Sequence, residues 1–141
     1  MKKVFKISSS LLYLEEVVRI SEYILSDEEF LNEVSKVKKF SSTNLKGVDV
    51  VLSISIGPVA TVSSYKTLNP WSSVTAYTTG KMIKFNTRNN PRSINSMVNT
   101  LIHEYMHVLG FHHSGNSSKG NQESIPYMVG DISETYVTKY L

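Results

Sequence analysis

The sequence predicts a single α/β domain over residues 1–141, in which helices pack on a small sheet. Apolar residues recur at helical spacing over residues 10–25 and 91–109, and β-branched segments lie between these two stretches. A hydrophobic content of 40% and a charged content of 19% are those of a globular protein that can bury a core.

The N-terminal part is predicted to hold one strand and two helices. Residues 3–7 favour a strand, and residues 10–25 favour a helix because their large apolar side chains follow a helical period. Residues 26–29 (Ser-Asp-Glu-Glu) are typical of a capping box. A second helix is therefore expected to begin there.

The middle of the chain is predicted to be extended. Residues 48–56 are rich in β-branched side chains, which favours a strand, and a weaker strand is expected over residues 59–65. Residues 73–78 and 81–86 flank a Thr-Gly pair. These two segments are therefore predicted to form an antiparallel hairpin.

A further helix is expected to start at Asn90-Pro91, because proline is favoured at the first helical position, and to end at Gly110. Its apolar stripe leaves His103 and His107 on the opposite face, so two imidazoles can face a cleft. The stripe consists of Ile94, Met97, Val98, Leu101, Ile102, Tyr105, Val108 and Leu109. Residues 131–134 are predicted to cap a last short helix.

Composition excludes several kinds of site and partner. The chain has no cysteine, so disulfides are excluded and any metal must be held by His, Asp or Glu. The net charge of +3 without a long basic run does not indicate nucleic-acid binding. No apolar run reaches the ~18 residues that a membrane-spanning helix needs. We therefore expect no nucleic acid and no membrane as partner.

The N-terminal residues are not expected to form a signal peptide, because Lys6, three serines and two glutamates interrupt the apolar run. We expect a protein that is cytoplasmic or released without a Sec-type signal. Residues 50–103 contain five basic side chains and no Asp or Glu. Basic residues there can favour acidic substrates, but lysines also protect strand edges from aggregation, and we prefer that interpretation.

His103 and His107 lie four residues apart, so on a helix their rings are neighbours and can share a metal ion. Zinc suits imidazole ligands, and catalytic zinc has three protein ligands and one water. Glu104 follows the first histidine, where a carboxylate can act as general base and then general acid.

The third ligand is predicted to be His113. Gly110 can adopt a positive φ at little cost, so the chain can turn as the helix ends and bring His113 back to the same metal. A chance match to all five positions is rarer than roughly one in a million per start site. A histidine-rich helix end without metal is the weaker alternative.

These residues resemble the signature of the metzincin clan of zinc peptidases, His-Glu-x-x-His-x-x-Gly-x-x-His followed by a Met-turn. The resemblance implies one Zn²⁺ per chain, a Met-turn at residues 124–130 with Met128 beneath the metal, and a zincin-like fold. In that fold a mixed, twisted sheet with an antiparallel edge strand packs on a long helix and an active-site helix. Residues 73–78 would then be the edge strand on which an extended peptide lies.

The chain also departs from the clan. Ser114 follows the third histidine as in matrixins, but residues 114–123 form a longer polar loop. Gly130 stands where astacin- and serralysin-like enzymes have a tyrosine, so Tyr127 is given no role. No carboxylate cluster for structural calcium lies in residues 50–103, and the absence of cysteine excludes a cysteine-switch segment.

Two remaining residues receive ordinary interpretations: His112 is expected at the pocket rim or facing solvent, and Trp71 is expected to pack in the core or a loop. The sequence therefore predicts a monomeric zinc endopeptidase that cleaves peptide or protein substrates. Two alternatives stay open. One is a zinc-stabilised binding module without turnover, and the other is a zinc amidase acting on a non-protein amide such as a cell-wall crosslink.

Overall fold

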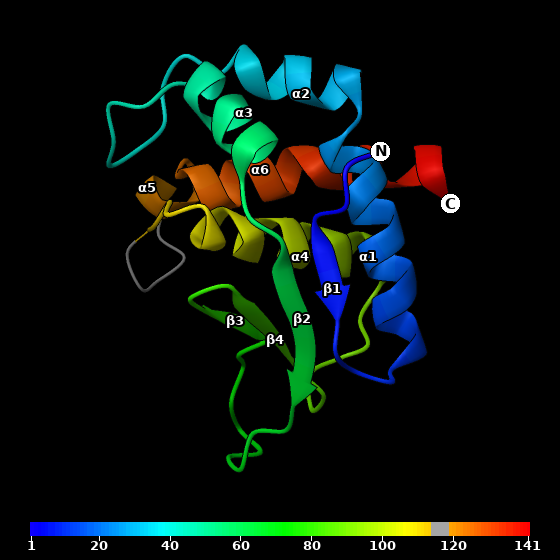
Figure 1. Cartoon of the computed structure of the whole chain (residues 1–141). Helices are drawn as coiled ribbons and strands as arrows, with labels where there is room; N and C mark the ends of the chain where they lie inside the picture. Colours follow the sequence, from blue (N-terminus) through cyan, green and yellow to red (C-terminus); the bar gives the residue numbers. More distant parts are fainter. Residues whose placement is uncertain (114–118) are drawn as a thin grey trace.

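The computed structural model describes residues 1–113 and 119–141 (Figure 1). The N-terminal elements are β1 (Phe5–Ile7), α1 (Leu12–Leu25), α2 (Glu28–Ser35) and α3 (Gly47–Ile56). The strands β2 (Ala60–Tyr65), β3 (Ala76–Thr79) and β4 (Met82–Asn86) follow. The C-terminal elements are α4 (Ile94–Val108), α5 (Lys119–Gln122), α6 (Ile125–Glu134) and the 3-10 helix η1 (Val137–Tyr140).

The four strands form one mixed sheet in the order β1-β2-β4-β3. β1 pairs with β2, and β2 with β4, in parallel. β3 pairs with β4 in the antiparallel sense and lies at the edge. The predicted hairpin and its antiparallel edge strand are confirmed, and Gly80 in its turn has a φ of 60°.

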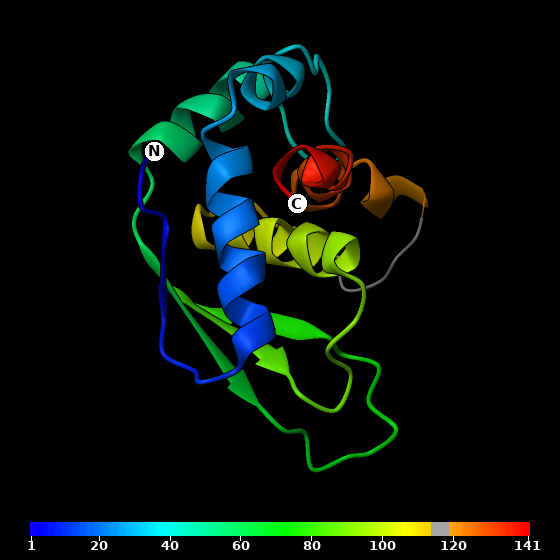
Figure 2. The ribbon, with the colours of Figure 1, turned by 90° about the vertical axis from the view of Figure 1, so that its right-hand side faces the viewer.

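Helices α1 and α4 lie against one face of the sheet, and α6 runs along α4 on the side away from the sheet (Figures 1 and 2). The core lies between these layers. Phe5 of β1 meets Tyr105 of α4 edge to face, with ring centroids 5.3 Å apart, and both are buried. Leu14 of α1 and Leu101 of α4 are also fully buried. The apolar stripe of α4 therefore anchors the helix and leaves its other face open.

Several predicted elements are confirmed: the strand within residues 3–7, the helix within 10–25 and the strand within 59–65. No helix in the described ranges is long and apolar enough to cross a membrane.

The strand predicted over residues 48–56 is wrong, because this segment forms helix α3. Its buried residues Gly47, Val50 and Ile54 recur at helical spacing, and Asp49 accepts a hydrogen bond of 2.8 Å from the backbone N–H of Lys46. A Cβ on Gly47 would lie 1.9 Å from the backbone oxygen of Val34, so glycine permits close packing on α2. Tertiary packing thus outweighs the strand preference of β-branched residues.

The second helix begins within residues 26–29, as predicted, but two other predicted helix starts were misplaced. Asp27, not Ser26, caps α2, because its side chain accepts a hydrogen bond from the backbone N–H of Phe30. Helix α4 begins after Ser93, whose hydroxyl accepts from the backbone N–H of Ser96, and not at residues 90–91. Residues 131–134 end α6, and the expected last short helix is the 3-10 helix η1, which begins later, after Tyr136.

Candidate metal centre

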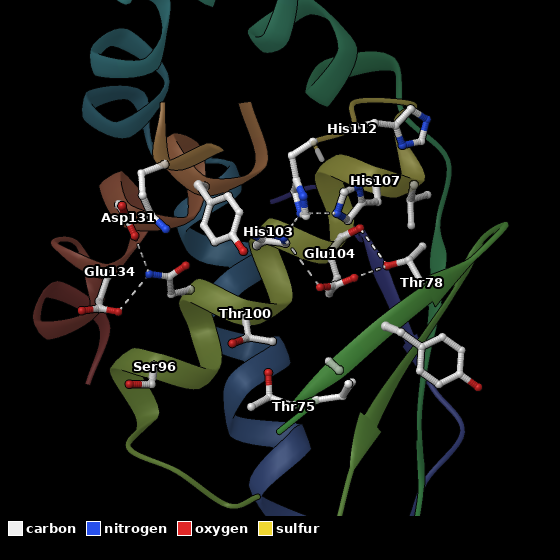
Figure 3. Close-up of a pocket in the computed structure, with 18 of the residues that line it drawn as sticks. Thr75, Thr78, Ser96, Thr100, His103, Glu104, His107, His112, Asp131 and Glu134 are labelled. Atoms are coloured by element: carbon white, nitrogen blue, oxygen red, sulfur yellow. Dashed lines mark hydrogen bonds and ion pairs between the residues drawn. The ribbon is translucent and has the colours of Figure 1, made fainter. Parts of the chain in front are cut away.

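Helix α4 and the turn that follows it bring three imidazoles together. His103 and His107 lie one turn apart on α4, with Nε2 atoms 3.0 Å and 3.2 Å from Nε2 of His113 (Figure 3). Their candidate ligand atoms all lie within 4.8 Å of one another. The structure thus gathers the three residues that the sequence analysis selected as metal ligands.

Gly110 makes this convergence possible. Helix α4 ends at Val108, and Gly110 has a φ of 98°, a conformation that side chains with a Cβ rarely adopt. The backbone N–H of Phe111 donates to the oxygen of Met106 at 3.0 Å, which folds the chain back over the last helical turn. His113 is therefore returned to the face that carries His103.

The backbone also orients His107. Nδ1 of His107 lies 2.8 Å from the carbonyl oxygen of Phe111. Because a carbonyl oxygen only accepts, the proton of neutral His107 lies on Nδ1, and Nε2 presents a lone pair toward the other imidazoles. Metal-binding histidines usually donate their second nitrogen to such an acceptor.

Two of the three nitrogen spacings are close to those expected of zinc ligands. Zinc–nitrogen bonds of about 2.0–2.1 Å at tetrahedral angles place ligand nitrogens roughly 3.3 Å apart. The two distances at His113, 3.0 Å and 3.2 Å, are close to that value. One proton on Nε2 of His113 can be donated to only one of the two neighbouring nitrogens. A cation among the three nitrogens would interact favourably with the lone pairs of all three.

Burial keeps His103 and His107 neutral, the form that binds a metal. Burial first, and then the neighbouring His107 and His113, lower the pKa of His103 to about 3. Burial also lowers the pKa of His107, although its hydrogen bond to Phe111 opposes this shift. Both rings are therefore unprotonated at neutral pH.

Glu104 lies beside the three histidines and is buried, with 9% of its surface exposed. Its Oε2 lies 3.8 Å from Nε2 of His103, and its Oε1 accepts a hydrogen bond of 2.8 Å from the hydroxyl of Thr78 on β3. In the metal-free site, burial raises the pKa of Glu104 to about 7, although the Thr78 hydrogen bond lowers it. A carboxylate with a pKa near neutrality can both take up and release a proton.

The three histidines line a groove with a volume of about 1230 Å³. Residues 73–78 of β3 and the preceding loop line it on one side, and α6 lines it on the other (Figure 3). On the α6 side, the amide of Asn99 donates to Asp131 at 3.0 Å and to Glu134 at 3.1 Å. The groove therefore runs along the open face of α4, between an edge strand and a helix.

The Met-turn predicted for residues 124–130 is wrong, because residues 125–134 form helix α6. Pro126 lies in the first turn of α6, where proline favours a helix. Met128 packs against the core and is not among the residues that line the groove in the described chain. The role expected of Met128 beneath the metal therefore has no structural support.

Tyr127, to which the sequence analysis assigned no role, lies against the histidines where Met128 was expected. Its ring contacts the rings of His103 and His113, with centroids 4.6 Å and 4.8 Å away. The signal was Pro126, which indicates a helix start and places Tyr127 on the first turn of α6. Tyr127 therefore forms part of the wall next to the three histidines.

The remaining predicted residues lie at the margin of the site or away from it. His112 is exposed and stacks on His107, with ring centroids 5.8 Å apart, as expected of a rim residue. Trp71, expected to pack, is 88% exposed. Ser114 and the first half of the polar loop assigned to residues 114–123 lie outside the described residues, and Lys119–Gln122 form the short helix α5 in place of a loop.

Comparison of the chain with known protein families, with curated proteins and with solved structures found no match.

Proposed function

We propose that the chain is a zinc-dependent hydrolase that cleaves peptide bonds. The observation that carries this proposal is the convergence of three imidazole nitrogens next to the buried carboxylate of Glu104. A structural zinc site normally fills all four positions with protein ligands, whereas this cluster offers three in the described chain and lies in an open groove. Support for a metzincin-like enzyme comes from the spacing of these residues in the sequence.

Each residue has a distinct task in this proposal. His103, His107 and His113 would hold one Zn²⁺ through Nε2. When bound, zinc polarises a substrate carbonyl and lowers the pKa of a water molecule to about 7. Glu104 accepts a proton from the attacking water and passes it to the leaving amine. Thr78 holds the carboxylate in position through its hydrogen bond.

The edge strand supports a peptide as substrate. β3 borders the groove and is paired on one side only, with β4, in the described sheet. An extended peptide can add to such an edge through backbone hydrogen bonds. Its backbone would then lie beside Glu104, which Thr78 of the same strand contacts.

The test is an unbiased peptide library incubated with zinc-loaded protein and analysed by mass spectrometry. The parent chain is expected to cleave peptides, and Glu104→Gln is expected to retain its zinc and lose about 10²–10⁴-fold in rate. Glu123→Gln, at an exposed position outside the groove lining, is the matched control and should cleave as the parent does.

Equal cleavage by Glu104→Gln and the parent would refute the mechanism. Zinc binding without cleavage of any peptide would refute the peptidase. Cell-wall fragments are included in the same assay, because hydrolysis of those fragments alone would assign the site to a different amide.

A further inference from the structure

The loop between β2 and β3, residues 66–75, projects from the end of the molecule opposite α3 (Figures 1 and 2). It carries two large apolar side chains that are almost fully exposed to solvent: Leu68 is 96% exposed and Trp71 is 88% exposed. We call Leu68 and Trp71 the apolar tip. Single exposed apolar residues are common, but two nearly complete exposures on one projecting loop indicate a surface that is covered in use.

The loop is held in place at its base. The amide of Asn89 donates to the backbone oxygens of Ser72 and Val74, both at 2.8 Å, and Asn90 donates to the oxygen of Thr75 at 2.9 Å. On the other arm, Nε of Arg88 donates to the oxygen of Thr67 at 2.5 Å. Because both arms are tied to the segment after β4, the apolar tip is presented by an ordered loop.

The surroundings of the tip are basic. Lys66 and Arg88, at the base of the loop, are both exposed. Lys84 lies on β4, two residues before Asn86, which holds the loop through bonds to Thr67 and Val74. Residues 50–103 contain no Asp or Glu, so no acidic side chain of this segment offsets these charges. The loop therefore combines an exposed tryptophan and leucine with exposed basic side chains at its base.

We propose that residues 66–75 dock the protein on an anionic lipid surface, with Leu68 and Trp71 entering the interface and Lys66 and Arg88 facing the headgroups. Tryptophan is favoured at the boundary between lipid and water, and lysine and arginine are attracted to anionic headgroups. A projecting tip suits insertion into lipid, whereas protein interfaces bury their aromatic anchors in complementary pockets. Peripheral attachment of this kind needs no membrane-spanning helix, so the inference departs from the expectation of no membrane partner.

Docking through this loop would also orient the groove. Ser73, Val74 and Thr75, on the descending arm of the loop, line the groove that contains His103 and Glu104. A lipid surface that covers the tip would therefore lie next to one end of the groove. The docking itself does not depend on the proposed hydrolysis, because none of its residues binds the metal.

Trp71 is the only tryptophan in the chain, so its fluorescence reports directly on the loop. The test titrates the full chain with vesicles of phosphatidylcholine containing about one-third phosphatidylserine, and with pure phosphatidylcholine vesicles. With the anionic vesicles we expect a blue shift of Trp71 emission and cosedimentation of the protein. Both should weaken as salt rises, because salt screens exposed charges.

Variants locate the contact. Leu68→Ser is expected to weaken the affinity for anionic vesicles about tenfold, and Lys66→Gln about fivefold. Leu52→Ser is the matched control, because Leu52 is 60% exposed on α3, at the opposite end of the molecule, and its replacement should leave the affinity unchanged. Circular dichroism of each variant reports whether it folds like the parent.

Three results would overturn the proposal. The first is no blue shift with anionic vesicles, and the second is equal binding to both vesicle types at every salt concentration. The third is a blue shift that follows protein concentration without lipid, which would assign the tip to contact between copies of the chain. Loss of peptide cleavage, by contrast, would bear on the proposed hydrolase alone.

Discussion

The hydroxyl of Thr78, on the edge strand β3, donates a hydrogen bond of 2.8 Å to Oε1 of Glu104 on helix α4, and it also lies 3.1 Å from the backbone oxygen of Glu104. One side chain thus ties the proposed substrate-binding strand to the proposed general base. Glu104 is buried, so a hydrogen bond to its carboxylate is worth more than one in water.

Thr78 is therefore expected to position Glu104. Thr78→Val should lower the rate of peptide cleavage about tenfold, because a hydrogen bond to a charged group is lost, and should leave the zinc content unchanged. Thr78→Ser should restore most of the rate. Thr79→Val, at an exposed position of the same strand, is the control. A Thr78→Val rate equal to that of the parent would contradict this role.

Gly110 is expected to matter for metal affinity as well as for stability. Gly110→Ala places a Cβ on a residue with a φ of 98°, although the space around it is open, so the cost is strain in the backbone. We expect a loss of about 1–3 kcal/mol in the free energy of unfolding, and weaker zinc binding.

Gly80→Ala is the matched control for Gly110→Ala. Gly80 also has a positive φ, 60°, and open space around it, but it lies in the hairpin turn. The Gly80→Ala variant should be less stable than the parent but should bind zinc with the same affinity. Calorimetric titration with zinc measures this affinity. Equal zinc affinities for the two variants would contradict the role of Gly110 in bringing the histidines together.

Asp27 joins the two ends of the chain and should give a pH-dependent contribution to stability. Burial raises its pKa, but hydrogen bonds from Lys139, from Tyr140 and from the backbone N–H of Phe30 outweigh burial and lower it from 3.8 to about 2. A carboxyl group whose pKa is lower in the folded than in the unfolded state stabilises the fold at pH values above its pKa in the unfolded state. This contribution is lost as the pH falls from 3.8 through about 2.

Asp27→Asn is expected to lower the free energy of unfolding near pH 7 by about 1–3 kcal/mol. Urea denaturation measured from pH 7 downward should show the difference from the parent shrinking below pH 3.8. Glu15→Gln, at an exposed position, should shift stability by less than about 1 kcal/mol. A difference for Asp27→Asn that stays constant with pH would contradict the assigned shift.

Gly47 should be intolerant of any side chain, because a Cβ there would overlap the backbone of Val34. Gly47→Ala is expected to destabilise the fold by about 1–3 kcal/mol, since α2 and α3 must move apart. Ser55→Ala, at an exposed position of the same helix, is the control. Thermal unfolding followed by circular dichroism measures both, and an unchanged midpoint for Gly47→Ala would refute the close packing.

The sequence predicted the convergence of the three histidines well, because it depends on local spacing. His103 and His107 are one helical turn apart on any α-helix, and Gly110 allows a short return to His113. The antiparallel hairpin was predictable for the same reason, since a Thr-Gly turn between two extended segments is a local signal.

Features that depend on tertiary packing were not predictable. Residues 48–56 read as a strand, and only their burial against α2 shows why they form a helix. The hydrogen bond between Thr78 and Glu104 joins residues 26 positions apart. Tyr127 was given no role, because its contact with the histidines depends on helix α6, which stands in place of the expected Met-turn. In each case the deciding contact is made with a residue far away in the sequence.

The most direct test of the account is the metal environment of the purified chain, measured by metal analysis together with zinc X-ray absorption spectroscopy. The account predicts about one zinc per chain, with three imidazole nitrogens at about 2.0–2.1 Å. His113→Ala should lose one nitrogen or the metal, whereas His112→Ala should retain both. A chain without zinc, or a zinc whose nitrogen count is the same in the parent and in His113→Ala, would contradict the central claim.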